Sequence, residues 1–279
     1  MTVLLTGAQG KIGQWVARHL AEAGYRLKGT DRNYARDFPG EWTVADLRQR
    51  EAIYPLLENV EAIVHLGNVP SALFGDPQSV CLDNTQINFH VFQAALEVGV
   101  KKIIFASSIQ CLSNGEGRWN AQSTVCLPYL PADENTPPRP GNAYALSKQL
   151  AENMLAYAVD RGLPEGIALR LPGIYSPERM ADLRESQRKP RTPVNVNELF
   201  SYLSVLDFAR LVKVLLRTPL PGYRVYFPAS YHNNDGRSAE TLARGVYPGV
   251  PVRQPLDQWG NGLIDNSTLT RETGWKPLD

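Results

Sequence analysis

Short apolar runs alternate with amphipathic stretches along the first 170 or so residues of the chain. The runs that predict buried strands are TVLLTG (2–7), RLKGTD (26–31), WTVAD (42–46), EAIVHLG (61–67), KKIIFASS (101–108) and GIALRLP (166–172). Between them, apolar residues three and four apart predict helices at about 11–23, 47–59, 84–98 and 143–160. This order is typical of an α/β protein with a doubly wound parallel sheet between two layers of helices.

The pattern changes near residue 172. The segment LPGIYSPERMADLRESQRKPRTP is rich in proline and charge, and we expect it to be irregular. An amphipathic helix at about 203–218 and a short strand, RVYFPAS (224–230), follow it. We therefore predict a nucleotide-binding domain at 1–171 and a smaller substrate-binding part at 172–279, with the helix at 203–218 packing back on the first domain.

The helix predicted at 143–160 carries two distinct faces. Its apolar stripe, which we expect to face the core, consists of Leu146, Leu150, Met154 and Tyr157. Tyr144 and Lys148 lie one turn apart, about 200° around the helix from that stripe. One interpretation is a solvated face on which Lys148 pairs with Glu152. The other is a site that uses the tyrosine and the lysine together.

Composition narrows the possible functions. Hydrophobic residues make up 43% of the 279 residues and charged residues 20%, so a folded core is expected. The net charge of +1 argues against a nucleic-acid-binding protein, and no apolar run is long enough to cross a membrane. The N-terminus does not resemble a signal peptide, and the three cysteines favour a reduced, cytoplasmic protein. The histidines lack metal-ligand spacing, so we predict no metal site.

A glycine-rich turn follows the first strand. In TGAQGKIG, Gly7 allows a tight turn, Gly10 lets the backbone approach a pyrophosphate, and Gly13 lets the next helix pack closely on the strand. Asp31, at the end of the second strand, can accept from both hydroxyls of an adenine ribose, which favours NAD. Two alternatives remain open: Asp31 is only a turn residue, or Arg32 beside it binds the 2′-phosphate of NADP.

Several motifs in order, each at a strand end or on the following helix, resemble the extended short-chain dehydrogenase/reductase superfamily. They are TGAQGKIG (6–13), DL (46–47), VHLG (64–67), FASS (105–108) and YALSK (144–148). The nearest branch is the NAD-dependent epimerase/dehydratase type, with a Rossmann-type fold. The resemblance covers about residues 2–178, and ETGWKP (272–277) is similar to the family's closing motif.

The resemblance implies that Ser108, Tyr144 and Lys148 are catalytic. A phenol has a pKa of about 10, too high for a base near neutral pH unless a cation lies close. Lys148 can supply that cation and hold the nicotinamide ribose, while the hydroxyl of Ser108 can orient a substrate oxygen.

The resemblance also implies the binding residues. For the cofactor they are Gly7, Gln9, Gly10, Lys11, Ile12, Gly13, Asp31, Arg32, Asp46, Leu47, Leu66, Gly67, Asn68, Asn84, Tyr144, Lys148 and Pro172, with Asp46 and Leu47 placed to reach the adenine. For the substrate they are Val69, Ser108, Ile109, Gln110 and Gly173. As alternatives, Asn84 is a helix N-cap, and His65 packs near the cofactor rather than acting in catalysis.

The chain departs from the family in several places. The loop at 113–141, with Trp119 and Tyr129, is longer than usual and is expected to cover part of the site. The residues after the serine, Ile109–Leu112, are altered. The segment between Pro177 and the helix at 203 is short for a nucleotide-sugar pocket, so a compact sugar, sugar acid or small polyol fits better. The basic residues at 179–191 are interrupted by acids, which favours a solvated or mobile segment over an anion-binding lid.

These observations predict an NAD-dependent oxidoreductase or epimerase that acts on a hydroxyl or keto carbon of a sugar-like substrate. Uronate dehydrogenases resemble the chain in length and motifs, so a uronate dehydrogenase is one alternative. A cofactor-sensing regulatory protein without catalysis is another, which the Tyr144–Lys148 pair argues against. In the family, the helices at 84–98 and 143–160 pair across a two-fold axis. The apolar Phe89, Phe92 and Leu96 therefore predict a homodimer.

Overall fold

A parallel sheet of seven strands organises the chain, whose computed structural model describes residues 1–112, 127–186, 196–256 and 260–278. The strands are β1 (Thr2–Thr6), β2 (Arg26–Asp31), β3 (Glu41–Val44), β4 (Ala62–His65), β5 (Lys102–Ser108), β6 (Glu165–Leu171) and β9 (Gly222–Tyr226). Their spatial order is β3-β2-β1-β4-β5-β6-β9, and each neighbouring pair is parallel. The order reverses between β1 and β4, and ligands of such sheets bind beyond the carboxyl ends of the strands at that point. The predicted fold class is confirmed.

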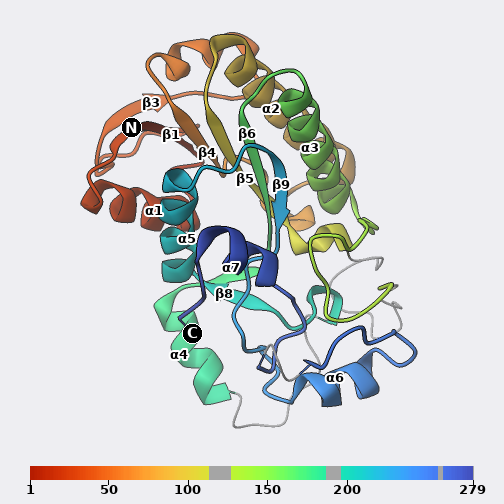
Figure 1. The fold of residues 1–279 in the computed structure, drawn as a ribbon. Helices are drawn as coiled ribbons and strands as arrows, with labels where there is room; N and C mark the ends of the chain where they lie inside the picture. Colours follow the sequence, from red (N-terminus) through yellow and green to blue (C-terminus); the bar gives the residue numbers. More distant parts are fainter. Residues whose placement is uncertain (113–126, 187–195, 257–259, 279) are drawn as a thin grey trace.

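Helices cover both faces of the sheet (Figure 1). On one face lie α1 (Lys11–Glu22) and α5 (Val205–Arg217), and on the other α2 (Pro77–Val98) and α3 (Ala143–Asp160). Alternate residues of β1 separate the two cores: Val3 and Leu5 pack with α1 and α5, whereas Leu4 packs with α2. Successive side chains of a strand point to opposite faces, and both faces are covered by helices, so every residue of β1 is buried.

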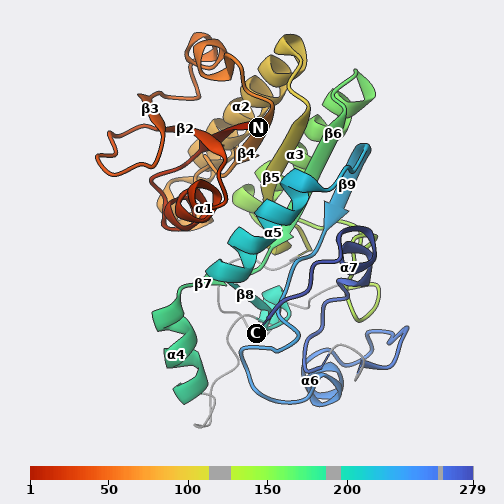
Figure 2. The same cartoon turned by 60° about the vertical axis from the view of Figure 1, so that its left-hand side comes forward.

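A smaller part lies beyond the carboxyl ends of the strands (Figure 2). It contains β7 (Gly173–Tyr175) paired with β8 (Tyr202–Ser204), and α4 (Pro177–Ser186), η5 (Val196–Glu198) and α6 (Ala239–Val246). Its core also includes Leu130 and Ala132, which form bridges with Val252 and Ile264. The last helix, α7 (Ser267–Thr273), packs through Leu269 on the α1 and α5 side of the sheet, as does Trp275 after it. The division of the chain at residue 171 stays a prediction.

One predicted helix is absent, and another begins earlier than predicted. In place of a helix at 47–59 there are two short 3₁₀ turns, η1 (Arg50–Ala52) and η2 (Tyr54–Leu57). Pro55 explains the break, because proline has no backbone N–H and clashes with the preceding turn of an α-helix. The helix predicted at 84–98 begins at Pro77, with Asp76 as its N-cap. Asn84 therefore lies inside α2, and its interpretation as an N-cap was wrong.

The orientation predicted for α3 was also wrong. Two of the four stripe residues are largely exposed, Leu146 at 41% and Tyr157 at 47%. The buried face contains Tyr144 and Lys148, together with Ala151 and Leu155. The buried residues of α3 include the small Ala145, Ser147, Ala151 and Ala158. Small side chains allow close packing, so we attribute the orientation of the helix to them rather than to its larger apolar residues.

The segment after residue 172 is more regular than expected. Pro177–Ser186 forms α4, which begins with the proline at a position where a missing N–H leaves no bond unmade. Met180 and Leu183 pack with Tyr175 and Tyr202. The helix was not predicted because its apolar face consists of only Met180 and Leu183, among many charged residues.

Candidate active site

The glycine-rich turn forms a cradle between β1 and α1. Gly7 has φ +64°, and a Cβ there would come within 2.8 Å of the backbone of Leu66 and Gly67. A Cβ on Gly13 would lie 2.3 Å from the carbonyl oxygen of Gly7, so the helix can approach only without a side chain. Gly10 is the N-cap of α1 and the first turn of the helix carries no acidic residue. The N–H groups at this end of the helix thus suit the pyrophosphate of a dinucleotide.

Asp31 ends β2 beside this turn. Its carboxylate accepts hydrogen bonds from the backbone N–H of Gln9 at 3.2 Å and of Arg32 at 2.7 Å. The side chain of Gln9 in turn donates to the carbonyl oxygen of Tyr34 at 2.8 Å. The acid is therefore held against the turn that would bind the pyrophosphate. Arg32 and Lys11 are exposed, and Ile12 is half-buried.

Asp46 and Leu47 have different surroundings from those expected. The carboxylate of Asp46 is paired with Arg48, at 2.6 Å from Nη2, and these hydrogen bonds lower the pKa of the acid. Arg48 also reaches Asp83 on α2 at 3.2 Å. The side chain of Leu47 is buried in the core under α2. Contact of either residue with an adenine stays a prediction.

Asn84 fixes the loop that follows β4. Its Oδ1 accepts from the N–H of Val69 at 2.7 Å, and its Nδ2 donates to the carbonyl oxygen of Val69 at 3.1 Å and to Ser147 on α3 at 3.1 Å. The asparagine is fully buried. It therefore ties the loop of Leu66, Gly67 and Asn68 to two helices.

Ser108 and Tyr144 meet at the carboxyl edge of the sheet. Ser108 is the last residue of β5, and Tyr144 lies in the first turn of α3, where Asn142 is the N-cap. Burial raises the pKa of the Tyr144 hydroxyl well above its usual range, whereas a side-chain hydrogen bond with Ser108 lowers it. Both side chains are less than 10% exposed, so water has little access to them.

Lys148 is buried one turn along α3. Its Nζ donates to Oδ1 of Asn68 at 2.6 Å and to the carbonyl oxygen of Ala106 at 2.7 Å. It lies 4.8 Å from the centre of the Phe105 ring and 5.6 Å from that of Tyr144. Burial lowers its pKa to about 7. The alternative in which Lys148 pairs with Glu152 on a solvated face was wrong, because Glu152 binds Arg170 of β6 instead, at 2.9 Å.

The residues predicted to bind substrate lie around this centre. Gln110 donates its backbone N–H to the Ser108 hydroxyl at 3.1 Å, and its side chain donates to Glu198 of η5 at 2.9 Å. The negative charge of Glu198 adds to the rise in the pKa of Tyr144. Ile109 is buried in the core of the smaller part, and so its side chain does not line an open site. Pro172 and Gly173 join β6 to β7 at the same edge.

The predicted covering loop and basic segment are described only in part. Trp119 lies outside the described residues, as do Arg188, Lys189 and Arg191. Tyr129 is buried, donates to Asp133 at 2.6 Å and has the guanidinium of Arg253 over its ring. Its contacts are therefore within the smaller part. A covering role for the rest of the loop stays a prediction.

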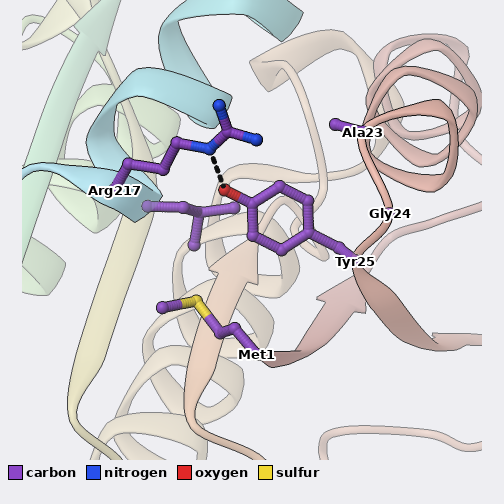
Figure 3. Close-up of a pocket in the computed structure, with 6 residues that line it drawn as sticks. Met1, Ala23, Gly24, Tyr25 and Arg217 are labelled. Carbon is purple, nitrogen blue, oxygen red and sulfur yellow. Dashed lines mark hydrogen bonds between the residues drawn. The ribbon is translucent and has the colours of Figure 1, made fainter.

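An open hollow of about 350 Å³ lies elsewhere, lined by Met1, Ala23, Gly24, Tyr25, Leu216 and Arg217. In Figure 3, Arg217 points at the hydroxyl of Tyr25, to which it donates at 3.2 Å. Met1 precedes β1, so this hollow is at the amino ends of the strands, remote from Tyr144. The described residues contain no group of three or more side chains that could hold a metal ion. No helix among them is apolar and long enough to cross a membrane.

Comparison with known proteins decides the family. The sequence profile of the NAD dependent epimerase/dehydratase family matches residues 3–225. The chain belongs to this family. It is accordingly an NAD(P)-dependent enzyme of the short-chain dehydrogenase/reductase type, and the resemblance recognised from its motifs is confirmed.

Individual relatives agree with this assignment. A uronate dehydrogenase of Pseudomonas syringae pv. tomato is 30% identical over 246 residues, which are 86% of this chain and 79% of that protein. An NAD-dependent glucose-6-phosphate dehydrogenase of Haloferax volcanii is 32% identical over 176 residues, 57% of this chain and 63% of that protein. The structure of a tyrosine-to-alanine mutant of uronate dehydrogenase from Agrobacterium tumefaciens, complexed with NAD, has a TM-score of 0.70 at 22% identity. It is covered over 84% of its length by the whole of this chain.

Sequence reasoning missed several residues that shape the site. Arg48 neutralises Asp46, Arg170 takes Glu152 away from Lys148, and Glu198 brings a negative charge near Tyr144. Asn88 on α2 connects Asn68 to His65. Arg48 is only two residues from Asp46, so its pairing could have been expected from the sequence. The other contacts join residues that are far apart in sequence, and no local spacing indicates them.

Proposed function

We propose that this site carries out hydride transfer at a hydroxyl or keto carbon of a sugar-like substrate. The observation that carries the proposal is the placement of Ser108, Tyr144 and Lys148, buried together at the carboxyl edge of the sheet beside the glycine-rich turn. When bound, NAD supplies the hydride chemistry. The protein's own residues bind, orient and move a proton.

In this proposal the Tyr144 hydroxyl exchanges a proton with the substrate oxygen at the reacting carbon. Ser108 holds that oxygen through its own hydroxyl. In its protonated form, which predominates below its pKa of about 7, Lys148 favours the phenolate that burial disfavours, since its Nζ lies 5.6 Å from the centre of the Tyr144 ring. Burial raises the pKa of Tyr144, so the phenol needs such a cation to act as a base.

We propose NAD rather than NADP as the preferred cofactor. The proposal is supported by the position of Asp31 at the end of β2, where its carboxylate accepts from the N–H of Gln9 in the glycine-rich turn and could accept from ribose hydroxyls. A second negative charge on a 2′-phosphate would be repelled there. Arg32 directly follows Asp31, and its side chain is the competing possibility for NADP.

Two substrate classes remain. Similarity to uronate dehydrogenase favours a sugar acid. The hydroxyls of Ser108 and Tyr144 suit a hydroxyl or keto oxygen, which neutral sugars, polyols and uronates all carry. We therefore propose a polyhydroxy substrate, and the choice between the two classes is left to the assay. A scan of neutral sugars, polyols and uronates with NAD, followed by NADH absorbance, tests the proposal. Turnover of none of these compounds would contradict it.

We propose a homodimer built on the α2 and α3 helices. Leu82 and Phe89 share one side of α2, and Leu146 and Tyr157 share one side of α3, and all four are exposed apolar residues. The two helices are neighbours (Figure 1). Phe92, which was expected to contribute, packs inside the core with His65 and Phe105 instead. The cytoplasmic location expected from the cysteines stays a prediction.

A further inference from the structure

An unbroken chain of hydrogen bonds joins Lys148 to the end of β1. Lys148 Nζ lies 2.6 Å from Asn68 Oδ1, and Asn68 Nδ2 lies 2.9 Å from Asn88 Oδ1. The same Asn88 oxygen is 2.9 Å from His65 Nε2, and His65 Nδ1 is 2.6 Å from Thr6 Oγ1. Thr6, His65 and Asn88 have no exposed surface. Catalysis as described above uses only the lysine of these five residues.

The chemistry of the donors fixes the direction of every bond. The protonated form of Lys148, present below its pKa of about 7, can only donate, so in this form Asn68 presents its oxygen to Lys148 and its NH₂ group to Asn88. Asn88 must then offer an oxygen, so His65 carries its proton on Nε2. Nδ1 of His65 consequently accepts from the hydroxyl of Thr6. The amide orientations and the tautomer, which are normally ambiguous, all follow from one positive charge.

The histidine is suited to this role because it stays neutral. Burial and the charge of Lys148 lower the pKa of His65 to about 3. At the other end, the N–H of Gly67 donates to Thr6 Oγ1 at 3.1 Å. The backbone of Gly67 is in turn packed against Gly7 of the cofactor cradle. The network therefore joins the lysine to the two loops that form the cradle.

We propose that Asn68 and Asn88 are positioning residues that hold the Lys148 ammonium at Tyr144 by anchoring it to His65 and Thr6. Two of the three Nζ protons are donated to Asn68 and to the Ala106 carbonyl. Because the nitrogen is tetrahedral, these two bonds also fix the direction of the third N–H. A long, flexible lysine side chain would otherwise have to be ordered at every turnover. This inference deepens the proposed function and rests on it.

The tautomer gives a test that is independent of activity. The chain has only four histidines, so ¹⁵N-histidine NMR can assign each by single substitution. We expect His65 in the neutral Nε2–H form at a pH between its own pKa of about 3 and the pKa of about 7 of Lys148, where the lysine is charged. We expect its ring signals to change in Asn88→Leu, which removes the acceptor of that proton. A wild-type His65 protonated on Nδ1 would overturn the network, whatever the substrate is.

Kinetics of Asn88 variants test the positioning role. Asn88 Nδ2 has no hydrogen-bond partner among the described residues, so Asn88→Asp keeps both accepted bonds through Oδ1. We expect Asn88→Leu to lower kcat about tenfold or more, the loss expected when a hydrogen bond to a charged group is disturbed. Asn88→Asp keeps the acceptor oxygen, so its kcat should fall less than that of Asn88→Leu, while the added buried charge should lower its Tm. Neither variant should change the KM for substrate much.

Val91→Ala is the matched control, because Val91 is buried on the same helix but contributes no polar atom to the network. It should lower Tm and leave kcat unchanged. An active wild type with an unchanged kcat in Asn88→Leu would overturn the inference and leave the proposed function standing. A wild type that is inactive on the whole substrate scan would instead contradict the proposed function, while the NMR result still decides the network.

Discussion

Arg170 of β6 and Glu152 of α3 form a buried ion pair next to β5, the strand that ends at Ser108. The guanidinium donates from Nε and Nη2 to the two carboxylate oxygens at 3.0 and 2.9 Å, and both side chains are about 5% exposed or less. Ser107 donates to the same carboxylate at 2.6 Å. The pair therefore connects β5, β6 and α3 just behind the predicted catalytic residues.

Removal of one member should destabilise the fold strongly. Arg170→Met leaves a buried carboxylate without its cation, for which a loss of about 3–5 kcal/mol is expected. Arg224→Met is the matched control, because the Arg224–Glu272 pair is partly exposed and should contribute about 1 kcal/mol or less. Urea unfolding of both variants measures the difference. Similar losses in the two variants would contradict the importance assigned to the buried pair.

The fold could be predicted from sequence to a large extent, because strand and helix periodicities are local properties. The order of apolar runs gave the parallel sheet, and the glycines gave the cradle. The surroundings of Lys148 could not be predicted, because Glu152, four residues along the helix, was the obvious local partner. Its true partner, Arg170, is on another strand. The face of α3 was missed for a related reason: small residues decide how closely a helix packs, and they do not stand out in a hydrophobic pattern.

Acid should weaken the fold through His65. The pKa of this buried histidine is lowered to about 3, below its ordinary value of 6.5. Between these two pH values the unfolded chain binds a proton that the folded chain does not, so stability falls as pH is lowered from about 6.5 to 3. His65→Gln should reduce this slope in urea midpoints measured at several pH values. An unchanged slope in His65→Gln would contradict this account.

Cofactor preference should follow the charge of Asp31. Asp31→Ser removes the carboxylate that would repel a 2′-phosphate, so the ratio of Kd for NADP to Kd for NAD should fall. Arg32→Ala should have the opposite effect on NADP binding, because it removes the nearby cation. Fluorescence titration with both cofactors measures the ratio. Wild-type binding of NADP equal to or tighter than that of NAD would contradict the assignment.

Substrate selection should depend on Glu198. Glu198→Gln keeps the size of the side chain and removes its negative charge. We expect kcat/KM for uronates to rise relative to that for neutral sugars. The comparison requires both substrate classes in one assay series. An unchanged ratio, or a wild type that prefers uronates, would favour the sugar-acid alternative.

Association should depend on the exposed face of α2 and α3. Phe89 is 44% exposed on this face, and a lysine there would place a charge in the proposed dimer interface. Light scattering should give a dimer mass for the wild type and a monomer mass for Phe89→Lys. Leu206→Lys, on α5 across the sheet, should remain dimeric. A monomeric wild type at micromolar concentration would contradict the proposal.

The central claim concerns the hydroxyl of Tyr144, and Tyr144→Phe removes that single atom while keeping the ring. Acid–base catalysis by a positioned side chain contributes about 10²–10⁴ in rate. We therefore expect kcat on a verified substrate to fall by about that factor, with the Kd for NAD little changed, because the cradle of Gly7, Gly10 and Gly13 is untouched. Turnover of Tyr144→Phe at the wild-type rate would contradict a catalytic role for the tyrosine.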